Sequence, residues 1–261
     1  MPFTLAHAAA ALPFRRTRLI LSAVVVGTFA PDFEYFLRMT PGGHFGNTLP
    51  GVFVLDLPLS LVVLWLFHAY MREPMVALLP DPIQCRIFPG PRTFRFWGPA
   101  RLALIFGSIL VGVGTHILWD SFTHPTFWLY RHWAVLSQTV RLPVVGTVQY
   151  YKLFQHGSTV IGCAALLIWL LLWYRATGPG QPLLVMPFSL AMKRWFLAFL
   201  ILIALFGALI RAFVGVGPPN SPRMAETFLG EAVVTTITLI WVQLLAYGII
   251  WSRQRKSRAQ I

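Results

Sequence analysis

The sequence predicts an all-α protein that crosses a membrane several times. Of its 261 residues, 57% are hydrophobic and only 11% are charged. The apolar residues gather in uninterrupted runs whose lengths are close to the roughly 20 residues that a helix needs to cross a bilayer. We therefore predict one polytopic transmembrane domain over residues 1–261, with about six transmembrane helices and a short apolar helix before them.

Each predicted helix follows from a local pattern. Residues 2–14 are apolar but too short to cross a bilayer, so we expect them to lie in the membrane interface or to enter it partway. In the first span Pro31 removes one donor of the helical ladder, and in the third span Pro125 favours an end of the helix at His124. The six apolar runs cover about residues 19–37, 51–70, 102–122, 153–174, 195–214 and 232–251.

The net charge of the chain indicates a membrane partner. Its 21 Lys and Arg residues exceed its 8 Asp and Glu residues and give a formal net charge of +13. In a membrane protein such an excess is typical of cytoplasmic loops beside anionic lipid, and the sequence has no basic module with interleaved aromatic residues. When the N-terminus is placed in the cytoplasm, most of the cationic residues fall on the inner side. We therefore expect membrane lipid as a partner, no nucleic acid, and both termini in the cytoplasm.

One stretch of the third span carries three potential metal ligands, His116, Asp120 and His124. Positions i, i+4 and i+8 advance by about 40° per step around a helix, so these side chains share a face. Ionisable groups inside a membrane are usually functional because they are costly without partners. In the same span Ser108 and Gly112 form a small-xxx-small pair that permits the close approach of another helix. The alternative is a buried hydrogen-bond network that only packs helices.

Further carboxylates and imidazoles fall on the same, outer side of the predicted topology. Imidazole and carboxylate groups suit zinc, and sites with several carboxylates also suit manganese or iron. The pattern therefore predicts a divalent-metal site, with zinc as the first choice, in residues 1–175, and a scaffold of two helices in residues 176–261. The alternatives are helix caps for the carboxylates and interface positions for the histidines. The residues concerned are Asp32, Glu34, His44, Asp56, His132 and His156.

Four motifs resemble the uncharacterised bacterial membrane family named domain of unknown function 4184: MPFTLAHAAAALPFRR, VVGTFAPDFEYF, THILWDSFTHP and YKLFQHGSTV. The resemblance covers most of the chain. More distantly, the pattern of His, Pro-Asp and His-x3-Asp is similar to the inner-membrane metal-dependent hydrolases. It is also similar to the zinc phospholipase C and P1 nuclease group, helical enzymes that hold a zinc cluster and cleave phosphoesters. The resemblance implies a bacterial inner membrane and metal ligands at His7, Asp32, His44, His116, Asp120, His124 and His156.

Two features of the sequence differ from the pattern of those zinc enzymes. A second His-x3-Asp pair is missing, because Val160 stands four residues after His156. In addition, the predicted topology places His7 near the inner surface. We expect His7 to reach Asp32 only if a helical hairpin turns near residues 13–18 and returns the N-terminal segment toward the first span.

The leading hypothesis is a membrane-embedded metal-dependent hydrolase that acts on a phosphoester or a lipid-linked substrate at the outer interface. One or two divalent ions held by His116, Asp120, His124 and Asp32 would activate water and polarise the scissile group. Asp32 and Glu34 are the candidate catalytic residues, and Glu34 is the candidate general base. The alternative is a non-catalytic integral membrane protein. It would be a transporter or proton relay, which needs polar residues strung across the bilayer, or a protein whose metal only clamps helices together.

Overall fold

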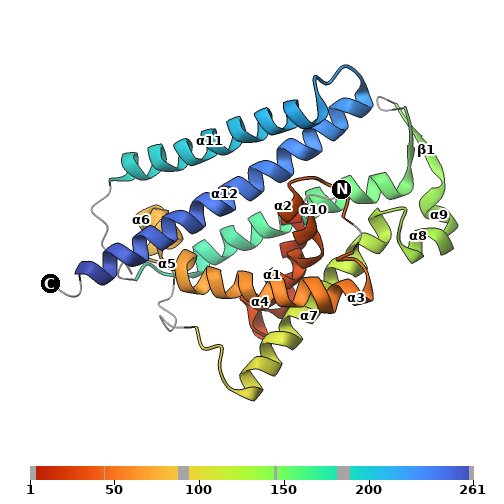
Figure 1. Cartoon of the computed structure of the whole chain (residues 1–261). Helices are drawn as coiled ribbons and strands as arrows, with labels where there is room; N and C mark the ends of the chain where they lie inside the picture. The colour runs from red at the N-terminus through yellow and green to blue at the C-terminus, as the bar shows by residue number, and fades with distance from the viewer. Residues whose placement is uncertain (1–3, 44, 88–93, 144–145, 181–188, 259–261) are drawn as a thin grey trace. The chain divides into compact units, whose positions relative to one another are not determined.

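The structure, a computed structural model, is almost entirely helical over the part of the chain that it describes (Figure 1). The described residues are 4–43, 45–87, 94–143, 146–180 and 189–258. Five helical stretches among them are long and apolar enough to cross a membrane: Leu49–Leu78, Pro99–His132, Tyr150–Ala176, Leu190–Val216 and Pro222–Gln254. These findings confirm the predicted class, an all-α polytopic membrane protein.

The N-terminal segment forms a short helix that precedes the first predicted span. This helix, η1 (Thr4–Arg16), has 3-10 geometry, and the Thr17 N–H donates to the Phe14 carbonyl in the turn that follows it. The first predicted span is not one regular helix. It is divided into α1 (Leu21–Phe29), a 3-10 turn η2 (Ala30–Asp32) and α2 (Phe33–Arg38). Pro31, which lacks a backbone N–H, lies in that turn and accounts for the interruption.

The second predicted span lies within one continuous series of helical segments. The series begins at Thr48, whose hydroxyl accepts a hydrogen bond from Gly51 N at 3.1 Å and so caps the first turn. Two of its segments, η3 and η4, have π-helical geometry, and the short helix α6 (Asp81–Gln84) follows the series. The segments are α3 (Leu49–Gly51), η3 (Val52–Asp56), α4 (Leu57–Leu66), η4 (Phe67–Met71) and α5 (Arg72–Leu78).

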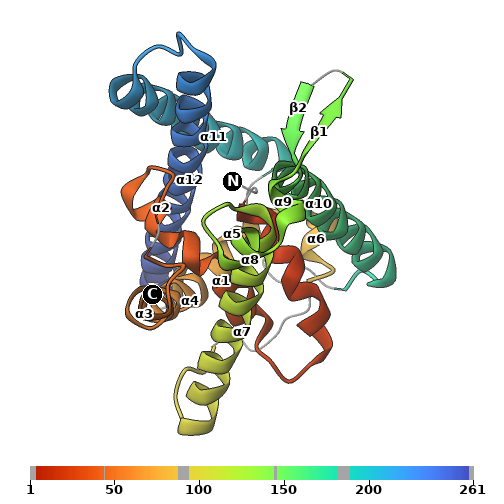
Figure 2. The ribbon, with the colours of Figure 1, turned by 90° about the vertical axis from the view of Figure 1, so that its right-hand side faces the viewer.

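The remaining four spans are long helices that include the predicted apolar runs and extend them. They are α7 (Pro99–Thr123), α10 (Tyr150–Ala176), α11 (Leu190–Val216) and α12 (Pro222–Arg258). Between α7 and α10 lie two short helices, α8 (Trp128–His132) and α9 (Ala134–Ser137), and a hairpin of two antiparallel strands (Figure 2). The strands are β1 (Thr139–Leu142) and β2 (Gly146–Gln149), with Thr139 opposite Gln149. No helix or strand was predicted from the sequence between the third and fourth apolar runs.

The chain divides into two compact units. The first unit comprises residues 1–33, 44–61 and 95–176, and the second comprises residues 34–43, 62–94 and 177–261. In the second unit the two predicted scaffold helices, α11 and α12, form an antiparallel pair (Figure 1). Arg211 on α11 donates to Glu231 Oε2 at 3.2 Å and to the Arg38 carbonyl at 3.0 Å. It thus satisfies a carbonyl at the end of α2 that has no partner within its own helix.

The first unit is built on the crossing of α1 with α7 (Figure 2). Gly27 and Gly112 meet at this crossing: a Cβ on Gly112 would overlap the Val24 carbonyl oxygen, and a Cβ on Gly27 would overlap the Ile109 carbonyl oxygen. The small residue at position 112 therefore permits the close helix approach that the sequence predicted. The N-terminal helix η1 packs against α1, α7 and α10 and completes the unit.

Candidate metal centre

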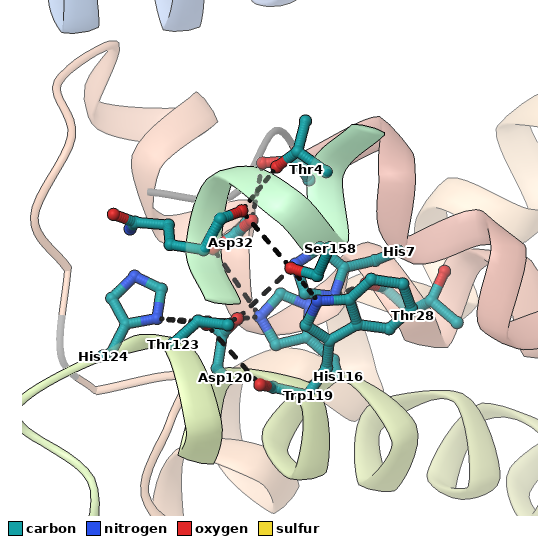
Figure 3. Close-up of polar contacts among 12 residues, drawn as sticks. Thr4, His7, Thr28, Asp32, His116, Trp119, Asp120, Thr123, His124 and Ser158 are labelled. Carbon is teal, nitrogen blue, oxygen red and sulfur yellow. Dashed lines mark hydrogen bonds and ion pairs between the residues drawn. The ribbon is translucent and has the colours of Figure 1, made fainter. Parts of the chain in front are cut away.

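Helix α7 presents the three predicted ligands at its C-terminal end (Figure 3). His116 and Asp120 are buried, and His116 Nε2 lies 3.3 Å from Asp120 Oδ2. The helix ends at Thr123, so His124 has an extended backbone and its N–H donates to the Asp120 carbonyl at 3.0 Å. His124 Nδ1 lies 3.4 Å from the same Asp120 Oδ2. The predicted helix end is confirmed, and so is the shared face for His116 and Asp120, whereas His124 lies beyond the helix and reaches Asp120 from an extended backbone.

His7 reaches the same carboxylate from the N-terminal helix η1. Its ring stacks on that of His116 with centroids 4.2 Å apart, and its Nε2 lies 3.5 Å from Asp120 Oδ1. The turn after Phe14 reverses the chain between η1 and α1, which is the hairpin that His7 was expected to need. Burial lowers the pKa of His7 to about 3, so its imidazole is neutral at neutral pH. A neutral imidazole is the form that binds metal ions.

Asp32 approaches the cluster from the 3-10 turn η2. Its two oxygens have different surroundings: Oδ2 accepts a hydrogen bond of 2.6 Å from the Thr4 hydroxyl, whereas Oδ1 lies 3.8 Å from His116 Nε2 (Figure 3). Asp32 is only 3% exposed. The interruption of the helix at Pro31 therefore places a buried carboxylate beside the imidazole of α7.

The proton of His116 can be assigned from its contacts. Its Nδ1 lies 2.8 Å from the Thr28 carbonyl oxygen, which can only accept, so Nδ1 carries the hydrogen of the neutral ring. The lone pair of Nε2 then faces the carboxylates of Asp32 and Asp120, and this buried nitrogen has no hydrogen-bond partner among the described residues. A backbone carbonyl behind the distal nitrogen is the usual support of a metal-binding histidine.

The separations between these atoms suit a bound cation better than direct hydrogen bonds. Nitrogen–oxygen hydrogen bonds are usually about 2.7–3.2 Å long, and the His–Asp separations here run from 3.3 to 3.8 Å. Two ligands of a tetrahedral zinc ion with bonds of about 2.0–2.2 Å lie about 3.3–3.6 Å apart. His7, His116 and Asp120 each offer a ligand atom within 4.8 Å of the others. These three residues form a buried group that can hold a metal ion, with Asp32 and His124 beside it.

The other predicted site residues have different surroundings. His44 lies outside the described residues. His156 is exposed on α10 and does not belong to the group that His7, His116 and Asp120 form. Glu34 belongs to the second unit, where its Oε1 accepts a hydrogen bond of 3.0 Å from Arg38.

Sequence reasoning missed the polar residues that support the cluster. Thr4 stands three residues before His7, and positions i and i+3 share a side of a 3-10 helix. That spacing is a signal that identifies Thr4 once η1 is assigned. Thr28 contributes a backbone carbonyl, which no side-chain pattern reveals. On α10, Ser158 accepts a hydrogen bond of 3.0 Å from Trp119 Nε1, and the Trp119 ring lies 5.2 Å from that of His7.

Comparison with known proteins gives a family but no named activity. Neither the curated proteins nor the solved structures include a significant match to the chain. One family model matches residues 1–249, a range that contains every residue of the candidate metal centre. The chain therefore belongs to the family described as Domain of unknown function (DUF4184).

Proposed function

We propose that this protein is a membrane-embedded, metal-dependent hydrolase. In this proposal His7, His116 and Asp120 hold a divalent ion, with zinc as the first choice because two imidazoles and a carboxylate suit it. The observation that carries the proposal is the buried Nε2 of His116, which has no hydrogen-bond partner among the described residues and lies 3.3 Å from Asp120 and 3.8 Å from Asp32. Two carboxylates buried side by side are unfavourable unless a cation compensates them.

The residues around the ion have separate tasks in this mechanism. A bound divalent ion acts as a Lewis acid and makes water more acidic. Asp32 is the proposed general base, because the Thr4 hydroxyl holds its Oδ2 and leaves Oδ1 toward His116. The role of Glu34, which forms an ion pair with Arg38, stays a prediction.

The exposed side of the centre indicates where a substrate would enter. The side chain of His124 is 17% exposed, whereas those of His7 and His116 are at most 1% exposed. His124 also lies at the end of α7, where a membrane-crossing helix reaches the head-group region. We therefore propose a phosphoester or lipid-linked substrate at the outer interface of the bacterial inner membrane, with both termini in the cytoplasm.

A structural role of the metal is the second candidate. Metal sites that only hold a fold together are closed, whereas catalytic sites keep an open position. The burial of His7, His116 and Asp120 favours a structural metal site, and the partial exposure of His124 favours a catalytic one. In either case the ion joins η1 to α7.

Elemental analysis of the protein purified in neutral detergent tests the site. We expect bound zinc in the wild-type protein and its loss in His116→Ala and Asp120→Ala. The matched control is His132→Ala, which removes an exposed histidine of α8. Zinc that persists in both ligand variants would contradict the site. A screen of phosphodiester and phospholipid substrates, with and without chelator, then distinguishes a catalytic from a structural metal. Hydrolysis that chelator abolishes supports the catalytic role. A protein that binds metal but hydrolyses none of the substrates supports the structural role.

A further inference from the structure

In the first unit the acidic residues are buried and the cationic residues are mostly exposed. Residues 1–33, 44–61 and 95–176 contain three acidic residues, Asp32, Asp56 and Asp120, and each is at most 4% exposed. The cationic residues of the same unit are mostly exposed. The acidic side chains therefore lie in the interior, where Asp32 and Asp120 belong to the candidate metal centre, and the outward-facing charges of this unit are positive.

Part of that positive surface is attached to the end of α7 that carries the candidate metal centre. We define the interfacial segment as residues 125–143 and 146–152, which contain α8, α9 and the two strands of the hairpin. Trp133 packs edge-on against Phe122 with ring centroids 6.0 Å apart, and Phe127 lies 6.1 Å from His124. At the other end of the segment, the rings of Tyr130 and Tyr151 meet edge to face at 5.3 Å. The contacts of Trp133 and Phe127 hold the interfacial segment beside His124, and the contact of the two tyrosines joins the ends of the segment.

The exposed side chains of the interfacial segment include three cations and two tryptophans. Arg131, Arg141 and Lys152 are exposed, and none of them has an ion-pair partner among the described residues. Trp128 is 68% exposed and Trp133 48% exposed. Tryptophan prefers the level of the lipid head groups, and arginine binds phosphate through two parallel hydrogen bonds.

We infer that the interfacial segment docks the phosphate head group of an anionic membrane lipid, and that such a lipid is the substrate class of the adjacent centre. The second half of this inference rests on the proposed hydrolase function, whereas the docking surface does not. A neutral head group would leave three exposed cations without a counter-charge. A lipid whose net charge is negative complements them, and the exposed tryptophans suit contact with the lipid at the level of its head group.

Native mass spectrometry of the full chain in neutral detergent tests the docking surface. The probes are phosphatidylglycerol and phosphatidylcholine with identical acyl chains. We expect phosphatidylglycerol to bind at least tenfold more tightly, and this preference to disappear in the triple variant Arg131→Gln, Arg141→Gln, Lys152→Gln. The matched control, Arg18→Gln, Arg95→Gln, Arg175→Gln, removes three exposed cations of the same unit and should keep the preference. The charge-keeping pair Arg131→Lys, Arg141→Lys should keep it as well.

The outcomes separate the docking surface from the proposed function. Equal affinity for the two lipids, an equal loss in the control variant, or full displacement of the lipid by equimolar inorganic phosphate would overturn the docking surface. A lipid preference in a protein that binds no metal and hydrolyses no lipid, both as purified and after incubation with zinc, supports the surface and refutes the hydrolase. Hydrolysis by the metal-loaded protein that does not distinguish phosphatidylglycerol from phosphatidylcholine overturns the substrate class alone.

Discussion

The imidazole rings of His7 and His116 stack with their centroids 4.2 Å apart and their planes inclined by 19°. The nearly parallel rings present Nε2 to the two oxygens of one carboxylate, at 3.5 Å from Asp120 Oδ1 and 3.3 Å from Asp120 Oδ2. The stack joins a 3-10 helix at the N-terminus to a helix that begins at Pro99. A metal held at this point would fix the N-terminal segment to the membrane-crossing core.

We expect His7→Ala to lose the bound metal, although His7 lies outside the five membrane-crossing stretches. Removing one of three protein ligands leaves too few donors for a tetrahedral ion. The measurement is the zinc content of the purified variant, and we expect a loss of about one ion per chain if the site is mononuclear. His156→Ala, which removes an exposed histidine, should leave the zinc content unchanged. The opposite pattern would assign the ligand to α10.

The close packing of α1 against α7 at Gly112 should be needed for full metal affinity, although Gly112 is not a metal ligand. Gly112→Val places a side chain against the backbone of Val24, so we expect the helices to separate and the free energy of unfolding to fall by about 1–3 kcal/mol. The separation also draws the Thr28 carbonyl away from His116 Nδ1. Metal affinity should therefore fall, as measured by competition with a chelating dye. Gly114→Val is the control, because a Cβ at position 114 meets nothing within 4 Å; equal losses in both variants would contradict the mechanism.

Asp32→Asn should separate catalysis from metal binding. The substitution keeps the shape of the side chain but removes its capacity to accept a proton, so turnover should fall by about 10²–10⁴-fold while zinc stays bound. Thr4→Val removes the hydrogen bond to Oδ2 and should lower activity by about 10–100-fold. Glu34→Gln tests the other predicted base. A larger loss of turnover in Glu34→Gln than in Asp32→Asn would reverse the assignment of the base.

Removal of the metal should release the N-terminal segment. Arg15 and Arg16 are exposed at the end of η1, so trypsin can cleave there when the segment opens. A metal ion that binds only while η1 is packed against the rest of the unit lowers the population of molecules in which η1 has detached. We expect cleavage after these residues to become at least several-fold faster after chelator treatment, as measured by intact mass. Cleavage after Arg175, at the end of α10, should keep its rate.

The parts of the structure that depend on local periodicity could be predicted from the sequence. The long apolar runs indicate the membrane-crossing helices, and the spacing of His116 and Asp120 places them on one face of α7. Pro125 correctly predicts that the helix ends before His124 takes an extended backbone. Each of these features is determined within a few residues of the position concerned.

The parts that depend on packing between distant segments could not be predicted in the same way. The sequence did not determine whether His7 returns to the cluster, because this depends on how η1 packs against α1, α7 and α10. The support of His116 by the Thr28 carbonyl involves a backbone atom, which leaves no mark in the residue pattern. The hairpin of β1 and β2 was missed because its strands have only four residues each and lie in an aromatic, polar stretch.

The presence of an ion between the two stacked histidines and Asp120 is tested most directly by X-ray absorption at the zinc edge of the purified wild-type protein. We expect a first shell of nitrogen and oxygen atoms at about 2.0–2.2 Å, with outer-shell scattering from two imidazoles and a reduced imidazole signal in His7→Ala. A protein that stays free of metal after incubation with zinc, or a zinc spectrum that is identical in wild type and His7→Ala, would contradict the assignment.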